Sequence, residues 1–327
     1  MQERTLGRTG RPVGLIGLGA WQLGADWGAV GEDDAMSVLE TALDEGVTLI
    51  DTADVYGDGR SETLCGQLLR RRPDAGVFVA TKMGRRMDQV PENYSREHFL
   101  EWNDRSRRNL GMDTLDLVQL HCPPTPVYST DVVFDALDEM VAAGRIRNYG
   151  VSVETCAEAL TAIARPHVAS VQIILNCFRT KPLERVLPAA RAAGVGIIAR
   201  VPLASGLLSG RYDETTTFAP DDHRTFNRHG ESFDVGETFA GVPFEVGLTA
   251  VSELRGLVPA GLAMAQFALR WIVDQDGVSV VIPGARNADQ VRGNAAAAAL
   301  PPLTPEQQAG VMEVYDRHIR AHVHERW

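Results

Sequence analysis

Three side chains that could carry proton chemistry crowd into residues 48–57, which read TLIDTADVYG. An apolar run ends in Asp51, and Asp54 and Tyr56 follow directly. A carboxylate at the end of a buried strand is costly unless something there needs charge. A phenol can give a proton when a neighbouring group lowers its pKa. The spacing therefore favours acid–base chemistry, although a solvated loop after a strand would also explain these residues.

Lysine is rare in this chain, so each lysine that is present is informative. The only two are Lys82 and Lys181, and arginine supplies the other basic side chains. Arginine does not lose its proton and carries a wide planar head, so it cannot replace a compact ammonium everywhere. Lys82 follows the apolar run 76–80 and is a candidate for such a site. We interpret Lys181 as an exposed lysine without a specific role.

The secondary structure that must position these residues is indicated by a pattern of strand then helix, repeated along the chain. A small hairpin is expected around residues 7–10, followed by eight strand–helix units. The strands are short continuous apolar runs, which indicate strands buried on both faces of a parallel sheet. Eight units in about 300 residues fit a closed (β/α)8 TIM barrel of the α/β class better than a doubly wound sheet. We expect this barrel, with extra helices near the C-terminus, to be a single domain over residues 1–327.

Two local features of this arrangement are predicted from turn and cap residues. A helix is expected over residues 61–71 with Ser61 as its N-cap, and a C-terminal helix over residues 305–321. The Gly-, Pro- and polar-rich segment 203–241 is too long for an ordinary connection and is predicted to be a functional loop over the barrel mouth.

The pair Gly17 and Gly19 does not start a dinucleotide fingerprint, because the third glycine is missing and no helix opens there.

Composition narrows the classes of partner and compartment. The net charge is −11 and the isoelectric point about 5.2, which argues against a nucleic acid or an anionic membrane as partner. The first ten residues lack the apolar core of a signal peptide, and no apolar run approaches the ~20 residues of a membrane span. We therefore expect a cytoplasmic protein. The scattered cysteines fit a reducing compartment; they are Cys65, Cys122, Cys156 and Cys177.

A histidine cluster near the C-terminus could form a metal site. His318 and His322 would share one helical face, and His324 follows. A solvated terminal helix explains the same spacing, so no metal is expected.

Polar residues end or follow six of the predicted strands. The active site of a TIM barrel lies at the C-terminal ends of its strands. Each residue has a structural explanation of its own, as a loop cap, a solvated turn or a satisfied core histidine. Their coincidence at one end of one barrel favours an active site. The residues are Asp51, Lys82, His121, Ser152, Gln172 and Arg200.

The sequence resembles the aldo-keto reductase family of NADPH-dependent, TIM-barrel oxidoreductases over essentially its whole length. The matching motifs are specific and lie throughout the chain. They are DTADVYG followed by Gly59, Ser61 and Glu62, ATK ending at Lys82, LDLVQLH ending at His121, GVS ending at Ser152, PLASGLLSGR at residues 202–211, and IPGARNADQVRGN at residues 282–294.

The resemblance implies a reaction and a catalytic tetrad. Hydride would pass from NADPH to an aldehyde or ketone, with Tyr56 as general acid. Lys82 would stabilise the phenolate and lower its pKa, and Asp51 would position Lys82. His121 would be a second donor at the carbonyl. The substrate, a small carbonyl compound, would lie against Trp21, Tyr56 and His121.

The resemblance also implies that NADPH or NADP⁺ lies extended across the barrel mouth. Ser152 and Gln172 would hold the carboxamide, and Arg200 would lie beside the nicotinamide. The pyrophosphate would lie along Pro202, Leu203, Ser205, Gly206, Leu207, Ser209 and Arg211. The 2′-phosphate and adenine end would be held by Gly284, Arg286, Gln290 and Asn294.

The chain departs from the family pattern at two positions. Val153 stands where many members have an asparagine, and Arg200 stands where many stack a tyrosine or tryptophan on the nicotinamide. A guanidinium there is expected to disfavour the cationic NADP⁺ and so favour reduction. An alternative function is an NADPH-binding regulatory subunit of the channel β-subunit type with little turnover, although the retained His121 speaks against it. Sugar-derived carbonyls, simple aldehydes and small ketones all remain open as substrates, and so does the oligomeric state.

Overall fold

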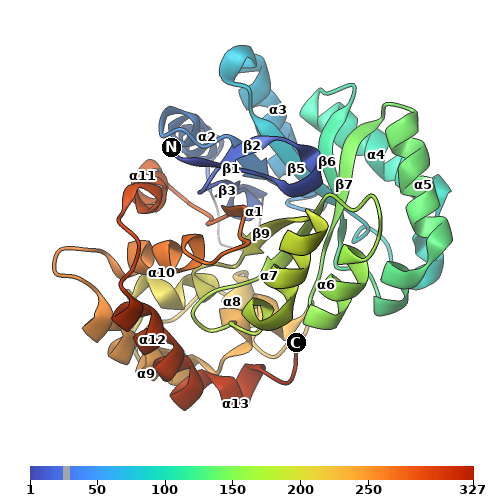
Figure 1. Ribbon diagram of the computed structural model, residues 1–327. Helices are drawn as coiled ribbons and strands as arrows, with labels where there is room; N and C mark the ends of the chain where they lie inside the picture. Colours follow the sequence, from blue (N-terminus) through green and yellow to red (C-terminus); the bar gives the residue numbers. More distant parts are fainter. Residues whose placement is uncertain (25–29) are drawn as a thin grey trace.

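A ring of parallel strands surrounded by helices forms the centre of the computed structural model, which describes residues 1–24 and 30–327 (Figure 1). The strands pair in the order β10-β9-β8-β7-β6-β5-β4-β3. Parallel bridges between Ile16 and Val281 and between Gly19 and Gly284 bring the two edges together. The expected eight-stranded barrel is therefore confirmed. Its strands are β3 (Leu18–Gly19), β4 (Leu49–Asp51), β5 (Phe78–Met83), β6 (Leu115–His121), β7 (Ile146–Ser152), β8 (Ser170–Ile174), β9 (Gly196–Arg200) and β10 (Val280–Val281).

The predicted N-terminal hairpin is also present and closes one end of the barrel. Strands β1 (Glu3–Thr5) and β2 (Pro12–Gly14) pair antiparallel. Leu6 and Val13 of this hairpin are fully buried in a cluster with interior strand residues such as Leu117. Burial of these apolar side chains stabilises the plug. A ligand must therefore approach from the opposite end, where the strands finish.

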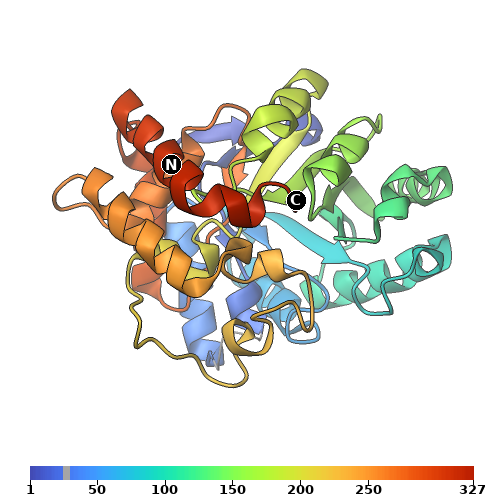
Figure 2. The ribbon, with the colours of Figure 1, turned by 90° about the horizontal axis from the view of Figure 1, so that it is seen from below.

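Amphipathic helices cover the outside of the barrel (Figures 1 and 2). In α2, for example, Ala35, Val38, Leu39 and Ala42 share the buried face, as a period of 3.6 residues requires. The helices are α1 (Trp21–Gly24), α2 (Glu32–Asp44), α3 (Arg60–Arg71), α4 (Arg96–Leu110), α5 (Asp131–Ala142), α6 (Cys156–Ile163), α7 (Pro182–Ala193), α8 (His223–Phe226), α9 (Phe244–Leu254), α10 (Met264–Val273), α11 (Ala288–Ala296), α12 (Pro305–Val314) and α13 (Arg320–Val323). No helix in the described part of the chain is long and apolar enough to cross a membrane.

Two predicted helix features differ from the structure. Ser61 is not the N-cap of α3: Gly59 precedes the helix with a φ of 92°, and Ser61 lies inside it. The Ser61 hydroxyl instead donates to the carbonyl of Ala20 at 2.9 Å and accepts from the Thr52 hydroxyl at 2.8 Å. The C-terminal helix is interrupted between α12 and α13 by a π-helical turn, Tyr315–Ile319, which keeps both of these residues buried.

The long segment between β9 and α9 packs on the barrel. It contains short helical turns, η5 (Ala204–Ser209), α8, η6 (Val235–Glu237) and η7 (Phe239–Gly241). In Figure 2 it is drawn yellow to orange and reaches the blue N-terminal helices. There Trp21 of α1 contacts His223 and Phe233, with ring centroids 4.9 and 5.8 Å apart. The segment thus adds side chains to the open end of the barrel.

Candidate active site

Lys82 is the centre of the residues that the sequence singled out. Its Nζ donates to Asp51 Oδ1 at 2.5 Å, to the carbonyl of Thr52 at 2.9 Å and to Tyr56 Oη at 3.2 Å. The side chain is only 1% exposed. Neighbouring parallel strands β4 and β5 bring Asp51 and Lys82 together at their C-terminal ends, and the turn after β4 places Tyr56 over them. All three ammonium protons are therefore directed at oxygen atoms, one of which is the phenol.

Burial and charge decide the protonation state of this group. Burial raises the pKa of Tyr56 above its ordinary value, and Lys82 only partly opposes this. Burial alone would lower the pKa of Lys82, but Asp51 and Tyr56 raise it by more than burial lowers it, so the net shift is upward. The expected effect of Lys82 on the phenol is thus present but smaller than the effect of burial. At neutral pH the phenol keeps its proton and the ammonium keeps its charge.

His121 completes the group from the end of β6. Its ring meets that of Tyr56 edge to face, with centroids 5.8 Å apart. Burial, followed by the charges of Arg85, Lys82 and Arg200, lowers its pKa well below the usual range. Its Nδ1 is buried and has no hydrogen-bond partner among the residues described. His121 is therefore a neutral imidazole beside the phenol.

The second oxygen of Asp51 is held by two amides. Asp51 Oδ2 accepts from Gln172 Nε2 at 2.7 Å and from Gln119 Nε2 at 3.2 Å, and Gln172 Nε2 also lies 3.1 Å from Gln119 Oε1. The Gln172 amide nitrogen is therefore committed to Asp51 and Gln119, which leaves its carbonyl oxygen for a ligand. Gln119 was missed at the sequence level. Gln119 could have been found in the sequence, because a side-chain amide inside the apolar strand that ends at His121 must find a hydrogen-bond partner.

A cavity of about 630 Å³ opens above these residues. Its volume is in the usual range for small-molecule sites. Trp21, which stacks on Tyr56 with centroids 5.9 Å apart, lies in its wall. Two predicted residues are not in the described wall. The side chain of Leu207 packs in the core beside Gly247, and Lys82 is buried in contact with Asp51 and Tyr56. The predicted residues in the wall are Trp21, Asp51, Tyr56, His121, Ser152, Gln172, Arg200, Pro202, Leu203, Ser205, Gly206, Ser209, Arg211, Gly284, Arg286, Gln290 and Asn294.

One part of the cavity is suited to an anion. Arg211 and Arg286 are exposed there, and neither guanidinium makes a hydrogen bond or ion pair within the described structure. Helix α11 begins beside them, with Asn287 as N-cap accepting from the Gln290 amide at 3.0 Å. Free guanidinium groups and a helix N-terminus both favour negative charge.

Two glycines bring bare backbone close to other side chains in the wall. A Cβ on Gly206, whose φ is +96°, would lie 2.1 Å from the Tyr212 hydroxyl. A Cβ on Gly284 would lie 2.0 Å from Gln22 Oε1. Both distances are too short for any side chain. Tyr212 and Gln22 already fill these positions, so the two glycines allow neighbouring segments of the wall to pack closely.

Arg200 lies in a cluster of four charges, of which Arg200 and Glu237 are buried and Arg85 and Glu154 are half-buried. Its Nη2 donates to Glu154 Oε2 at 2.7 Å, and its Nη1 lies 3.8 Å from Glu237 Oε1. Arg85 Nη2 lies 2.8 Å from Glu237 Oε1 and 3.3 Å from Glu154 Oε1. We call Arg85, Glu154, Arg200 and Glu237 the charge quartet. The guanidinium of Arg200 is thus paired with carboxylates, whereas the sequence had suggested an uncompensated positive charge.

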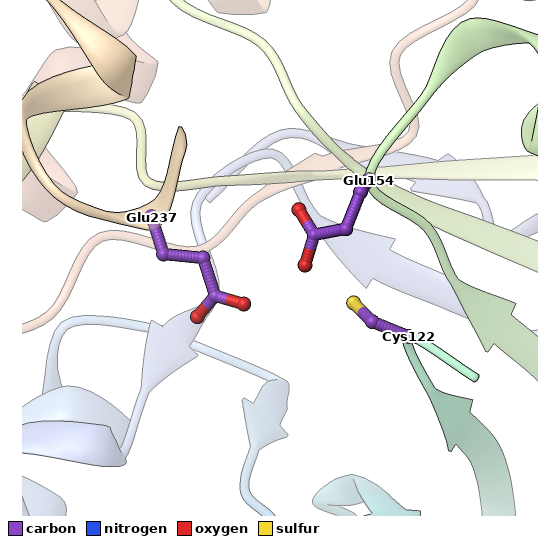
Figure 3. A group of neighbouring side chains, drawn as sticks. All are labelled: Cys122, Glu154 and Glu237. Atoms are coloured by element: carbon purple, nitrogen blue, oxygen red, sulfur yellow. The ribbon is translucent and has the colours of Figure 1, made fainter. Parts of the chain in front are cut away.

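Two carboxylates of the quartet also approach a thiol. Figure 3 shows Cys122, Glu154 and Glu237 pointing toward one another, and their potential ligand atoms all lie within 4.8 Å. Burial raises the pKa of the Cys122 thiol, whose Sγ donates to Ser152 Oγ at 3.3 Å. The two arginines already provide the positive charge that the carboxylates need, so ion pairing explains this arrangement without a metal ion.

Comparison with known proteins places the chain in a family. The model of the Aldo/keto reductase family matches residues 15–316. The chain is 31% identical to "Aldo-keto reductase YhdN" of Bacillus subtilis (strain 168), over 89% of this chain and 87% of that protein. It is 30% identical to a "Probable voltage-gated potassium channel subunit beta" of Arabidopsis thaliana, over 93% and 94%.

A solved structure agrees with these sequence matches. A crystal structure of an aldo-keto reductase from Klebsiella pneumoniae in complex with NADPH superposes with a TM-score of 0.69 at 25% identity and covers 96% of each chain. Fold, sequence and strand-end residues point in one direction: this chain belongs to the aldo/keto reductase family.

Proposed function

We propose that this protein is an NADPH-dependent reductase that delivers hydride to a small aldehyde or ketone, with Tyr56 as the general acid. The observation that carries the proposal is the contact of a buried, charged Lys82 with both Asp51 and the Tyr56 hydroxyl at the floor of a ligand-sized cavity. A carbonyl that accepts hydride becomes an alkoxide and needs a proton. Tyr56 is positioned to give one.

The residues of the chain divide the work as follows. Tyr56 keeps its proton until an alkoxide forms, because burial holds its pKa high. Lys82 stabilises the phenolate that remains after transfer, and Asp51 keeps Lys82 in place. A neutral His121 with its proton on Nε2 avoids burying an unpaired N–H at Nδ1 and can donate to the same carbonyl oxygen. Trp21 and Tyr56 offer flat faces to the substrate.

The described residues fit the nicotinamide cofactor that supplies the hydride. The cavity continues past Ser205 and Gly206, which leaves room for an extended pyrophosphate, and the free guanidiniums of Arg211 and Arg286 suit a 2′-phosphate. The carbonyl oxygen of Gln172 and the hydroxyl of Ser152 suit a carboxamide. An aldo-keto reductase of similar structure was solved with NADPH, which supports the same choice here.

A second candidate function is an NADPH-binding regulatory subunit with little turnover. The similarity to a probable potassium channel β-subunit favours it. The tetrad contacts favour the enzyme, because a binding role does not need a phenol held by an ammonium.

The test is loss of NADPH absorbance when purified protein is given sugar-derived carbonyls, simple aldehydes and small ketones. We expect turnover with at least one class and none with Tyr56→Phe. NADPH binding without turnover on any carbonyl would favour the regulatory role. Absence of NADPH binding would contradict both.

A further inference from the structure

Glu237 is an acidic residue of the long segment that lines the cavity. It ends η6, its side chain is 8% exposed, and it lines the same cavity as Tyr56 and His121. Burial alone would raise the pKa of Glu237. The nearby guanidiniums of Arg85 and Arg200 outweigh burial and lower this pKa to about 2. Glu237 is therefore a fixed negative charge at the reacting end of the cavity.

The quartet that contains Glu237 balances its own charge. Two guanidiniums, from the ends of β5 and β9, face two carboxylates, one after β7 and one from the long segment. Of the other ionisable groups at this end, Lys82 is paired with Asp51 and His121 is neutral. Arg179 lies among the charges of Glu154, Arg200 and Asp234 and is the same in every variant compared below. Without Glu237, one positive charge of the quartet would be left uncompensated.

This balance matters because the proposed cofactor changes charge during the reaction. The nicotinamide ring is neutral in NADPH and positive in NADP⁺, so a positive neighbour weakens binding of the oxidised form only. We propose that Glu237 sets the relative affinity for NADP⁺ and NADPH by cancelling the positive charge of Arg200. The inference rests on the proposed function, because it requires a nicotinamide at this end of the cavity.

The carboxylate of Glu237 can be changed without removing the other contacts of its segment. The Glu237 carbonyl accepts from Ser205 Oγ at 3.1 Å, and Ser205 Oγ accepts from the Phe239 backbone amide at 3.0 Å. Trp327 Nε1 donates to Asp234 Oδ1 at 3.0 Å. These bonds hold residues 234–239 independently of the carboxylate. A glutamine at position 237 keeps the size of the side chain and removes only the charge.

The experiment measures dissociation constants of NADPH and NADP⁺ by direct titration of purified protein. Burial and, less strongly, the charge of Glu237 raise the pKa of Glu154 to about 7, although Arg200 opposes this. The titrations are therefore done at about pH 8.5, where Glu154 is ionised. We expect Glu237→Gln to raise the ratio Kd(NADP⁺)/Kd(NADPH) at least about tenfold, because one uncompensated charge within about 12 Å is worth at least that factor at an effective dielectric constant of about 20.

Charge compensation separates this effect from general damage. Arg200→Gln should lower the same ratio, and the double variant Glu237→Gln/Arg200→Gln should return it to within about threefold of the parent, because removing both charges restores the net charge of the quartet. The matched control is Glu214→Gln, an exposed glutamate of the same segment outside the described cavity wall, which should leave the ratio unchanged.

A parental ratio in Glu237→Gln, or shifts of the same sign in both single variants, would overturn the inference. If circular dichroism shows that Glu237→Gln does not fold, Arg200→Gln and the neutral double variant provide the test, with a lowered and a near-parental ratio expected. A parent protein that fails to bind NADPH would refute the proposed function itself. Normal NADPH binding with an unmoved ratio would refute only the role of Glu237.

Discussion

Replacing Lys82 by arginine tests whether the site needs a compact ammonium or only a positive charge. In the structure one nitrogen atom meets three oxygens at 2.5–3.2 Å, and one of them is the Tyr56 hydroxyl. A planar guanidinium spreads its charge and its donors over three nitrogens. A guanidinium cannot donate to all three oxygens from one nitrogen atom. The contact to the phenol is the longest of the three and is the one that we expect to be lost.

The expected size of the effect follows from this geometry. If the phenol loses its ammonium, general acid catalysis is disabled, and turnover should fall by at least ~10²-fold, about 2.7 kcal/mol in the activation free energy. Lys82 is among the largest fully buried side chains, so the larger arginine should also cost about 1–3 kcal/mol of stability through overpacking. The affinity for NADPH should change little, because Lys82 is absent from the described wall of the cavity.

The assay compares kcat, KM and NADPH affinity of Lys82→Arg with those of Lys181→Arg. Lys181 is the only other lysine and lies at the start of α7, far along the chain from the tetrad. It controls for the exchange itself and should behave like the parent. Tyr56→Phe should be as damaging as Lys82→Arg, and the double variant little worse, because the two groups act as one unit.

The reasoning would be refuted by a folded Lys82→Arg protein with near-parental kcat on a good substrate. The proton would then come from another group. A selective rise in the dissociation constant of NADPH with unchanged kcat would likewise show that Lys82 serves cofactor binding rather than proton transfer.

Three further changes test other parts of the site. Arg286→Ala should narrow the preference for NADPH over NADH by roughly 1.5–3 kcal/mol in direct titrations, the scale of a charged hydrogen bond; equal affinities in the parent would contradict this role. Gln119→Leu removes one donor to Asp51 and should lower kcat about tenfold with NADPH affinity unchanged; an unaltered kcat would show that Gln172 alone suffices. Burial, followed by Glu62, raises the pKa of Asp54 to about 8, so this group stabilises the fold at low pH and the contribution is lost as pH rises toward 8. Asp54→Asn should therefore reduce the fall in unfolding free energy between about pH 5 and pH 8, by at most about 1.4 kcal/mol per pH unit, and identical pH slopes in chemical denaturation of the two proteins would contradict this.

The sequence by itself determined the barrel and singled out the four residues of the proposed tetrad, because both follow from patterns that are local along the chain. Apolar runs and helix signals such as the Ser95 cap and the Gly111 stop of α4 mark each element. Parallel strands must finish at one edge, so Asp51, Lys82 and His121 could be expected to meet once the strands were counted. The family motifs then supplied roles that the residue types alone left open.

Only the tertiary structure decided which buried charges and amides pair with one another. Arg85 and Glu237 are 152 residues apart, and Asp51 and Gln172 are 121 apart, with no periodicity or motif linking them. Arg200 looked like an isolated charge because one partner, Glu154, lies in the loop after β7 and the other, Glu237, lies on a segment without a readable pattern. A buried ion must find a counter-charge somewhere, and the sequence states that requirement, but the position of the counter-charge depends on how distant segments pack.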